Sequence, residues 1–512
     1  MHDVTARPAA PLPWSLLLTV WLAGLSVRLA AAARCGSLNP DGVVDLDQAR
    51  AWAAGDVSGA LAPGFSPLLS VLAASLHRLF ATPLEGSALA VVVLGSSLAA
   101  PASAAAAGWI WPQAARRAAF AAGLLAAVHP YLVRLGGQIM GYGLSQGLLA
   151  VGAALTVRAL LEPRARVAAL AGATLGLAFL ARTDALTGAA GLACALACGS
   201  RRRPAQLGAF ACAGLLVTGP YLLALRVHHG EWRLSGRKTV TELVDPTPIA
   251  TAALPGETLG GLAAAEAVTE AGTPVPPDWI GGWVEVTTYA SGKLIAAVVP
   301  PLFGLALLGA LVAAARPRGP PAHLWGLLTF LAGQILLRAN FGYTGRIHAS
   351  SAAVLAAPLA AVGWTWIPWR RLGGRHARLL AAGTLALGLL ALLPKALKPQ
   401  QAGRAPQAQV GAWVRAEFGD AADPVWGLDS RVVAYYAGAT YRDTPSLTPA
   451  ELVRQGRAAG ARAFVVAVRH RGPRPEALEA ALARAGAERV DPGFESEVEK
   501  TTYRWLVFRL PR

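Results

Sequence analysis

Carboxylates gather just after the first apolar segment, within residues 39–79. Asp41, Asp45, Asp47 and Asp56 all lie in this stretch. An ionised carboxylate can take a proton from a hydroxyl group or orient it for attack, which is the work of a general base. We take Asp41 as the candidate acid–base residue, with Asp45 and Asp47 as the alternatives. The competing interpretation is structural, because Asp41 precedes a helical stretch and Asp is a favoured helix N-cap.

Cationic side chains form the second group of candidates. Arg182 and Asp184 lie between two short apolar segments, and charged residues at membrane depth are commonly functional. The two could equally pair with each other or extend toward water at the membrane surface. Arg237 and Lys238 are a second basic pair, and Arg346 lies in a later loop. The arginine fork suits a phosphate group, so the sequence predicts a phosphate contact here, the alternative being solvated charge.

The histidines give no metal site. His129 directly precedes Pro130 inside an apolar stretch, where proline removes a helix hydrogen bond. We interpret His129 as part of a helix break. His228 and His229 are adjacent, and neighbouring residues do not face each other on a helix. No metal is assigned and no cofactor is expected, although a divalent ion stays open.

Long apolar segments recur from Trp14 to Pro394, and about 20 such residues suffice to cross a bilayer. The sequence predicts an α-helical polytopic membrane protein with about eleven transmembrane helices. The first segment is expected to remain as an anchor, the alternative being a cleaved signal peptide. Residues 65–80 are amphipathic, which predicts a helix in the membrane interface or else a short span. The predicted spans are residues 14–33, 87–111, 119–135, 143–161, 168–181, 186–198, 206–225, 294–315, 324–337, 349–367 and 379–394.

The charge of the chain is a topology signal. Lys and Arg number 46 against 29 Asp and Glu, a formal net charge of +17. Much of the arginine lies in short clusters between apolar segments, unlike the basic, aromatic-rich face of a protein that binds nucleic acid. With the N-terminus in the cytoplasm, every arginine-rich loop falls inside. The acidic stretch, the Arg182 turn and the tail then lie outside the cytoplasmic membrane.

The composition changes at residue 395. Strand-like runs at 425–429, 463–468 and 503–509 alternate with helical runs at 452–459 and 475–485. This alternation predicts a small α/β domain. We therefore expect a transmembrane domain at 1–394, with outer loops 34–86 and 227–292, and an extracytoplasmic α/β domain at 395–512.

The order of several short motifs resembles the GT-C superfamily of membrane glycosyltransferases. After the acidic loop come HPYLVRLGGQ at 129–138, LARTDAL at 180–186 and GRIHASSAAVLAAPLAAVG at 345–363. The nearest branch looks like the family-39-like enzymes related to protein O-mannosyltransferases and lipid A aminoarabinose transferases. The resemblance covers most of the chain, including the α/β tail, and its specificity lies in the order and spacing of the motifs.

The resemblance implies an enzyme that takes a sugar from a polyprenyl-phosphate carrier in the bilayer. The acceptor would be a lipid, glycan or protein of the cell envelope. Asp41 matches the start of the family pattern DGxxYxxLA, and Arg182 with Asp184 matches LxRPEGL. Arg237 and Lys238 match a family SGK, and Arg346 matches a family arginine. These matches imply acid–base and substrate-binding roles.

One family feature is missing. A second acid is expected near Gly141 or Tyr142, and neither residue is acidic. Gln138 and Tyr142 are the polar residues of that segment and become substrate-binding candidates. The departure supports an alternative, a catalytically silent scaffold of envelope polysaccharide assembly. A transporter would instead show an internal repeat with matched broken helices, which the sequence lacks.

Overall fold

The computed structural model describes residues 12–62, 65–162, 164–199, 203–235, 238–239, 302, 305–306, 308, 351–367, 374–401, 405–419, 424–428, 430–444, 447–470, 476–490, 493–498 and 501–511. These residues divide into two compact units. The first holds most of the chain as far as Lys398. The second holds Cys35–Val44 together with the described residues from Pro399 onward.

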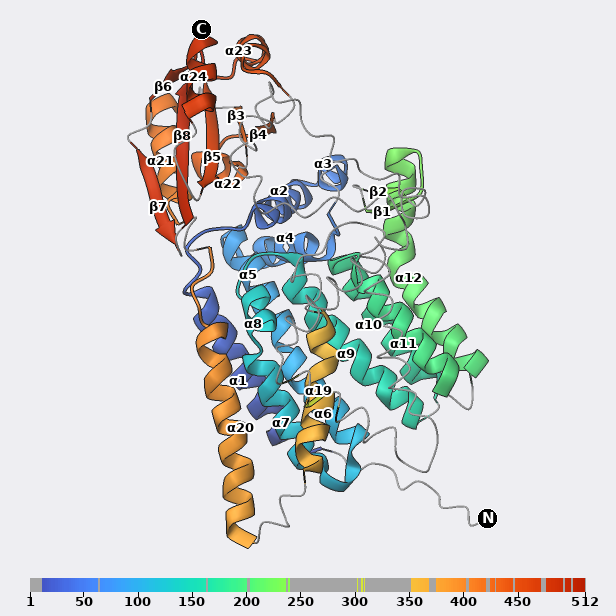
Figure 1. Cartoon of the computed structure of the whole chain (residues 1–512). Coiled ribbons are helices and arrows are strands. Elements are labelled where there is room, and N and C mark those ends of the chain that lie inside the picture. Colours follow the sequence, from blue (N-terminus) through green and yellow to red (C-terminus); the bar gives the residue numbers. More distant parts are fainter. Residues whose placement is uncertain are drawn as a thin grey trace, which may run out of the picture. The chain divides into compact units, whose positions relative to one another are not determined.

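The first unit is a helical bundle (Figure 1). Among the described residues, five helical segments are long and apolar enough to cross a membrane, with Leu84–Ile110 (α5 and α6) counted as one, or six if one bent pair is counted as a span. This confirms a multi-pass helical membrane protein, while the full number of spans stays a prediction because residues 309–350 lie outside the described ranges. The helices are α1 (Trp14–Ala32), α5 (Leu84–Ser97), α6 (Ala99–Ile110), η1 (Pro112–Ala114), α7 (Ala115–Val128), α8 (Pro130–Gly136), α9 (Gly141–Leu161), α10 (Ala165–Ala181), α11 (Ala185–Gly199), α12 (Arg203–His229), α19 (Ser351–Trp366) and α20 (Gly374–Ala396).

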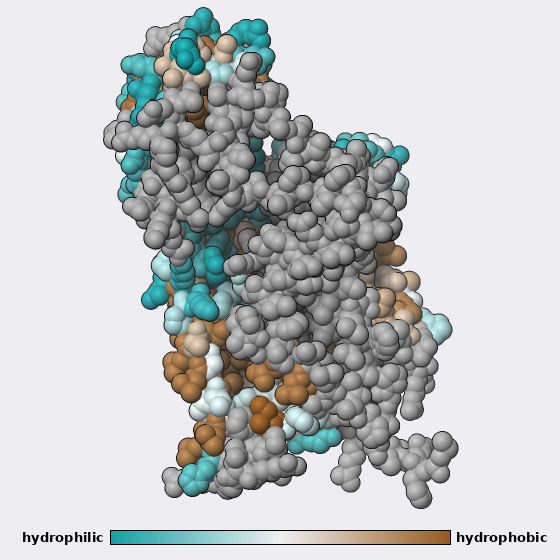
Figure 2. All heavy atoms as spheres, in the orientation of Figure 1, coloured by the Kyte–Doolittle hydropathy of each residue, from teal (hydrophilic) through white to brown (hydrophobic). Residues whose placement is uncertain are grey.

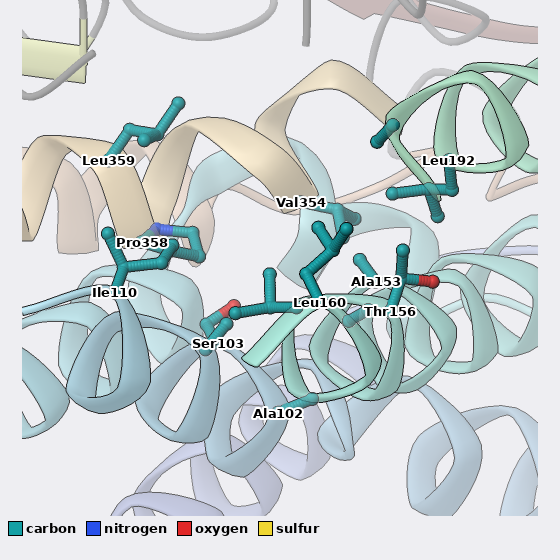
Figure 3. A pocket seen from close by; sticks show the side chains of 14 residues that line it. Ala102, Ser103, Ile110, Ala153, Thr156, Leu160, Leu192, Val354, Pro358 and Leu359 are labelled. Carbon is teal, nitrogen blue, oxygen red and sulfur yellow. The ribbon is translucent and has the colours of Figure 1, made fainter. Parts of the chain in front are cut away.

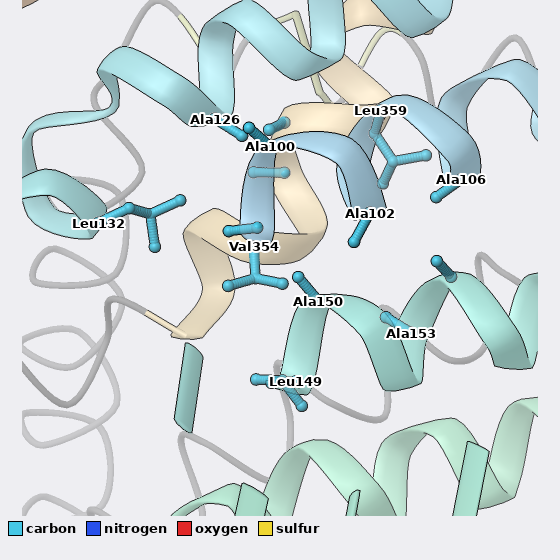
Figure 4. Packing of buried hydrophobic residues seen from close by; sticks show 14 of the residues in the cluster. Ala100, Ala102, Ala106, Ala126, Leu132, Leu149, Ala150, Ala153, Val354 and Leu359 are labelled. Carbon is cyan, nitrogen blue, oxygen red and sulfur yellow. The ribbon is translucent and has the colours of Figure 1, made fainter. Parts of the chain in front are cut away.

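Small residues let these helices pack closely. The buried core is built largely of alanine, and Figure 4 shows Ala100, Ala102 and Ala150 beside the larger Leu149 and Val354. Helices in lipid gain little from hydrophobic burial, so close van der Waals contact between small residues becomes the main attraction. Outward-facing leucines of α20 remain exposed and give the visible flank of the bundle its apolar colour in Figure 2.

The predicted helix break at His129-Pro130 is confirmed. Helix α7 ends at Val128, and His129 adopts an extended conformation with ψ of 121°. Pro130 then occupies the first turn of α8, where a missing N–H costs nothing. The chain bends by 56° between the axis of α7 and the axis of α8.

Three short helices follow α1: α2 (Pro40–Ala54), α3 (Val57–Leu61) and α4 (Leu68–Phe80). Helix α4 lies across the ends of the long helices in Figure 1. Its 13 residues give a length of about 20 Å, too short for a bilayer core of about 30 Å. Leu79 and Phe80 at its end are exposed. These features agree with the predicted interfacial helix.

The second unit contains a six-stranded sheet, which confirms the predicted α/β tail. The strand order is β4-β3-β5-β8-β6, and β7 pairs with β8. Strands β3, β4 and β5 are parallel, and β8 runs antiparallel to its neighbours. The elements are α21 (Gln407–Phe418), β3 (Val425–Leu428), α22 (Arg431–Ala437), β4 (Tyr441–Asp443), α23 (Pro449–Ala458), β5 (Ala463–His470), α24 (Glu476–Arg484), β6 (Glu488–Arg489), β7 (Phe494–Val498) and β8 (Thr501–Arg509).

Alternating side chains of the strands build two cores, one on each face of this sheet. On one face, Phe464 and Phe508 pack with residues of α23 and α24. On the other face, Val465 and Val507 pack with residues of α21 and α22. The period of two along each strand is what sends neighbouring residues to opposite faces.

Candidate functional site

Asp41 lies in the first turn of α2, but it is not the helix cap. Asn39 provides the cap, since its Oδ1 accepts a hydrogen bond from the backbone N–H of Asp41 at 2.9 Å. Pro40 begins the helix, and Asp41 is its second residue. The structural interpretation of Asp41 as an N-cap is therefore wrong. Its carboxylate is partly exposed and lies where the helix dipole favours negative charge.

The other acids of this stretch differ sharply in environment. Asp45 is buried, with only 4% of its surface exposed, and it shares a helix face with Asp41 at i, i+4 spacing. Asp47 is exposed and forms an ion pair of 2.6 Å with Arg50 on its own helix. Asp56 caps α3, because its side chain accepts from the N–H of Gly59 at 2.9 Å. Asp47 and Asp56 thus have local roles, and Asp41 and Asp45 remain the stronger candidates.

A buried amide fixes the acidic loop around Asp45. Gln48 is fully buried, and its Nε2 donates to the carbonyl oxygens of Ala60 at 2.7 Å and Phe65 at 3.3 Å. Its Oε1 accepts from the hydroxyl of Ser70 at 2.9 Å. One side chain thereby joins α2, α3 and α4. Tyr221 of α12 donates to the same Phe65 carbonyl at 3.3 Å, which ties α12 to this loop.

Arg182 and Asp184 form the ion pair that the sequence left open. The Nε of Arg182 lies 3.7 Å from Oδ1 of Asp184, with 21% and 38% of the two side chains exposed. The Arg182 guanidinium also lies over the ring of Tyr142, 3.5 Å from its centroid. Such a cation–π contact is strongest where the ring is shielded from water, and only 5% of Tyr142 is exposed.

The start of α9 and the end of α10 bring Tyr142 to Arg182. Ser145 of α9 donates to the carbonyl of Ala178 in α10 at 3.1 Å. A Cβ on Gly141 would lie 2.5 Å from the carbonyl oxygen of Ala181. Position 141 therefore has no room for any side chain, and an acid is excluded there for a steric reason. Gln138, 7% exposed, lies just before this contact.

The remaining cationic candidates are less defined. Lys238 lies in the short strand β2 (Lys238–Thr239), which pairs antiparallel with β1 (Arg233–Ser235) after α12. Arg237 and Arg346 lie outside the described residues. Their proposed phosphate contacts stay predictions.

Arg28 is a buried cation that the sequence analysis overlooked. It lies inside the first span, and none of its surface is exposed. Its Nη1 donates to the carbonyls of Gly24 at 3.0 Å and Ala127 at 3.4 Å. A Cβ on Gly136 would come within 3.0 Å of its Nε. Arg28 therefore lies beside the C-terminal ends of α7 and α8, where helix dipoles are negative. A lone arginine in an apolar segment was the available signal.

An apolar cavity lies elsewhere in the bundle, between α6, α9, α11 and α19 (Figure 3). Ala102, Ile110, Ala153 and Leu192 are among its lining residues, and none of the described lining residues is charged. The described lining residues therefore offer no group for acid–base chemistry. Within the described part of the chain, no three His, Cys, Asp or Glu side chains are arranged to hold a metal ion.

Several solved structures of membrane glycosyltransferases align with this chain. ArnT from Cupriavidus metallidurans bound to undecaprenyl phosphate aligns with a TM-score of 0.56 and 14% identity, covering 98% of this chain and 99% of that one. The oligosaccharyltransferase AglB from Archaeoglobus fulgidus, in complex with an inhibitory peptide and a dolichol-phosphate, gives 0.51 and 12%, covering 96% and 74%. The arabinofuranosyltransferase AftD from Mycobacteria gives 0.52 and 16%, covering 98% and 42%.

These likenesses define the class of fold. The chain has the GT-C fold of membrane glycosyltransferases, as the order of its motifs predicted. The likeness to ArnT runs over the whole chain, α/β tail included. No protein-family model and no curated protein matches the sequence.

Proposed function

We propose that this protein is an integral membrane glycosyltransferase that moves a sugar from a polyprenyl-phosphate carrier to an acceptor of the cell envelope. The acceptor is a lipid, glycan or protein, and the reaction takes place at the outer face of the cytoplasmic membrane. The observation that carries the proposal is full-length similarity in fold to ArnT, which has been solved with undecaprenyl phosphate. The Archaeoglobus fulgidus oligosaccharyltransferase has been solved tethered to an acceptor peptide, which extends the same fold to acceptor binding.

The chemistry needs a base and a cationic group. In the proposed reaction, the acceptor hydroxyl attacks the anomeric carbon of the sugar and gives its proton to Asp41, with Asp45 as the alternative base. The bond from the anomeric carbon to the phosphate oxygen breaks, and the polyprenyl phosphate leaves with the electron pair. Cationic groups at the phosphate would stabilise the departing charge.

Arg182 is the best-defined candidate for the phosphate contact. It is held by Asp184 on one side and the Tyr142 ring on the other, which fixes its guanidinium without hiding it, since 21% of the side chain is exposed. Lys238, Arg237 and Arg346 are proposed as further contacts to the carrier on the strength of the sequence motifs. Asp184 would orient Arg182, and Gln138 would lie beside the substrate.

One observation favours the alternative of a catalytically silent scaffold. A Cβ at position 141 would clash with the Ala181 carbonyl, and position 142 is taken by a Tyr that packs against Arg182, so neither place near the second family acid carries a carboxylate. Under this alternative, the fold is kept while sugar transfer is absent.

Mass spectrometry of envelope lipids, glycans and proteins from a deletion strain separates the two. The enzyme predicts that one sugar modification disappears and that its polyprenyl-phosphate donor accumulates, with both restored by the wild-type gene. A scaffold predicts general loss of the assembled polymer without donor accumulation. An unchanged envelope, with no accumulated donor, would refute both.

A further inference from the structure

The segment that carries Asp41 is attached to the start of the α/β tail. Cys35 and Gln400 form an isolated parallel β-bridge, and the N–H of Gly36 donates to the Gln400 carbonyl at 2.9 Å. The hydroxyl of Ser37 donates to Oε1 of Gln407 at 3.1 Å. All of these residues belong to the second unit, although more than 360 positions separate the two segments.

The contact is buried and polar. Ser37 is 7% exposed, and Gln400 and Gln407 are each 1% exposed. A hydrogen bond shielded from water is worth more than an exposed one, and a buried polar group left without its partner is costly. Gln407 is also held firmly, because it begins α21, whose Val410 and Val414 are fully buried against the sheet. The sheet domain therefore presents a rigid acceptor to the Ser37 segment.

The hydrogen bond between Ser37 and Gln407 lies only a few residues from Asp41 along the chain. Asp41 follows Ser37 by four residues, and Asn39 between them caps α2 through the Asp41 N–H. The first turn of α2, as far as Val44, groups with the sheet domain, and the helix continues into the bundle from Asp45. The placement of the Asp41 carboxylate thus depends on where Ser37 is held.

We propose that Gln407 is a positioning residue, through which the α/β tail holds the Ser37–Asp41 segment in the geometry that sugar transfer requires. The proposal rests on the proposed function, in which Asp41 contacts the acceptor. It assigns the tail a task that sequence motifs do not reveal. The residue that acts is Asp41, and Gln407 acts on it only through Ser37 and the cap of α2.

A native cysteine reports on this attachment without any enzyme assay. Cys35 is partly buried, and its thiol donates to the Ser37 carbonyl at 3.2 Å. Burial raises the pKa of the Cys35 thiol, which keeps it in the less reactive protonated form. Release of the segment would expose the thiol and lower its pKa, and both changes speed alkylation.

The experiment uses the full chain in membranes, with Cys194, Cys198 and Cys212 changed to Ala so that Cys35 is the remaining cysteine. Gln407→Ala and Ser37→Ala remove the two ends of one hydrogen bond. Gln409→Ala is the matched control, because Gln409 lies on the same helix and is exposed. The maleimide labelling rate of Cys35 and the rate of sugar transfer are measured for each variant, at equal amounts of protein that elutes as a folded species in detergent.

The proposal predicts faster Cys35 labelling in Gln407→Ala and in Ser37→Ala, with Gln409→Ala unchanged. Transfer falls by about tenfold in both, the factor to which a hydrogen bond of about 1.4 kcal/mol corresponds, and the double variant is no worse than either single one. Unchanged labelling in Gln407→Ala would overturn the attachment, and faster labelling with undiminished transfer would overturn the positioning role. If the variants show the predicted labelling rates but the wild-type protein transfers no sugar, the proposed function is refuted and the attachment is established.

Discussion

The guanidinium of Arg182 lies 3.5 Å from the ring centroid of Tyr142, and the same guanidinium pairs with Asp184. Two residues forty positions apart thus meet where α10 ends and α9 begins. The contact places a charged group between a ring and a carboxylate, with part of its surface open to a ligand. It also replaces the carboxylate that the family resemblance led us to expect in this segment.

Removing the ring should weaken binding of the carrier phosphate. Tyr142→Leu loses a cation–π contact of about 0.5–2 kcal/mol, so we expect affinity for undecaprenyl phosphate to fall by up to about 30-fold. Tyr142→Phe keeps the ring face and should bind nearly as well as the wild type. Titration of the purified protein with undecaprenyl phosphate measures this. Equal affinity in Tyr142→Leu would show that the ring does not hold Arg182 for the phosphate.

A methyl group at position 141 should separate α9 from α10. In Gly141→Ala the new Cβ would meet the Ala181 carbonyl oxygen at 2.5 Å, so the backbone must move and Tyr142 with it. We expect a lower thermal stability, by about 1–3 kcal/mol, and weaker carrier binding. Gly208→Ala is the control, because nothing lies within 4 Å of a Cβ at that site. Thermal unfolding in detergent compares the two, and equal behaviour would contradict the packing.

Loss of the buried cation should loosen the bend between α7 and α8. Arg28→Ala removes the bond to the Ala127 carbonyl and leaves a cavity, so we expect a loss of about 2–4 kcal/mol in stability. Arg28→Lys keeps the charge at the two helix ends and should lose less. Arg158→Ala should cost about 0–1 kcal/mol, because Arg158 is 45% exposed in its pair with Glu162. Thermal unfolding of all three decides whether Arg28 matters more than a surface arginine.

Acid should weaken α23 of the tail. Glu451 and Thr448 form a capping box, in which the Glu451 carboxylate accepts from the Thr448 N–H at 2.9 Å. These hydrogen bonds lower the pKa of Glu451 below its ordinary value of 4.5. A depressed pKa contributes stability that is complete above the unfolded-state value and is lost as the pH falls through the folded-state value. Protection of the α23 amides against hydrogen exchange, taken relative to their intrinsic exchange rates at each pH, should therefore fall below about pH 4.5, and Glu451→Gln should remove much of this pH dependence. An identical pH profile in Glu451→Gln would contradict it.

Sequence reasoning identified what depends on local pattern. Apolar length predicted the membrane bundle, Pro130 predicted the helix break, and period-two runs predicted strands near Val425, Ala463 and Tyr503. Strands β4, β6 and β7 of the sheet were not predicted. Strands β4 and β6 have only three and two residues, too few to show a period.

The site was harder to predict because it depends on contacts across the fold. Arg182 was a candidate from its charge, but the Tyr142 ring above it comes from the packing of two helices. Asn39 as the cap of α2 was missed because Asn39 and Asp41, on either side of Pro40, could each serve, and only the hydrogen bond distinguishes them. The roles of Asp41 and Asp45 in transfer stay predictions.

The rate of sugar transfer by Asp41→Asn tests the central claim most directly. Membranes are taken from the deletion strain, in which we expect the polyprenyl-phosphate donor to accumulate, and each variant is added back at a matched amount of folded protein. We predict that wild-type protein consumes this donor and that Asp41→Asn, which keeps the size of the side chain, is slower by about 10²–10⁴-fold, the usual contribution of a general base. Transfer by Asp41→Asn at the wild-type rate would contradict the assignment.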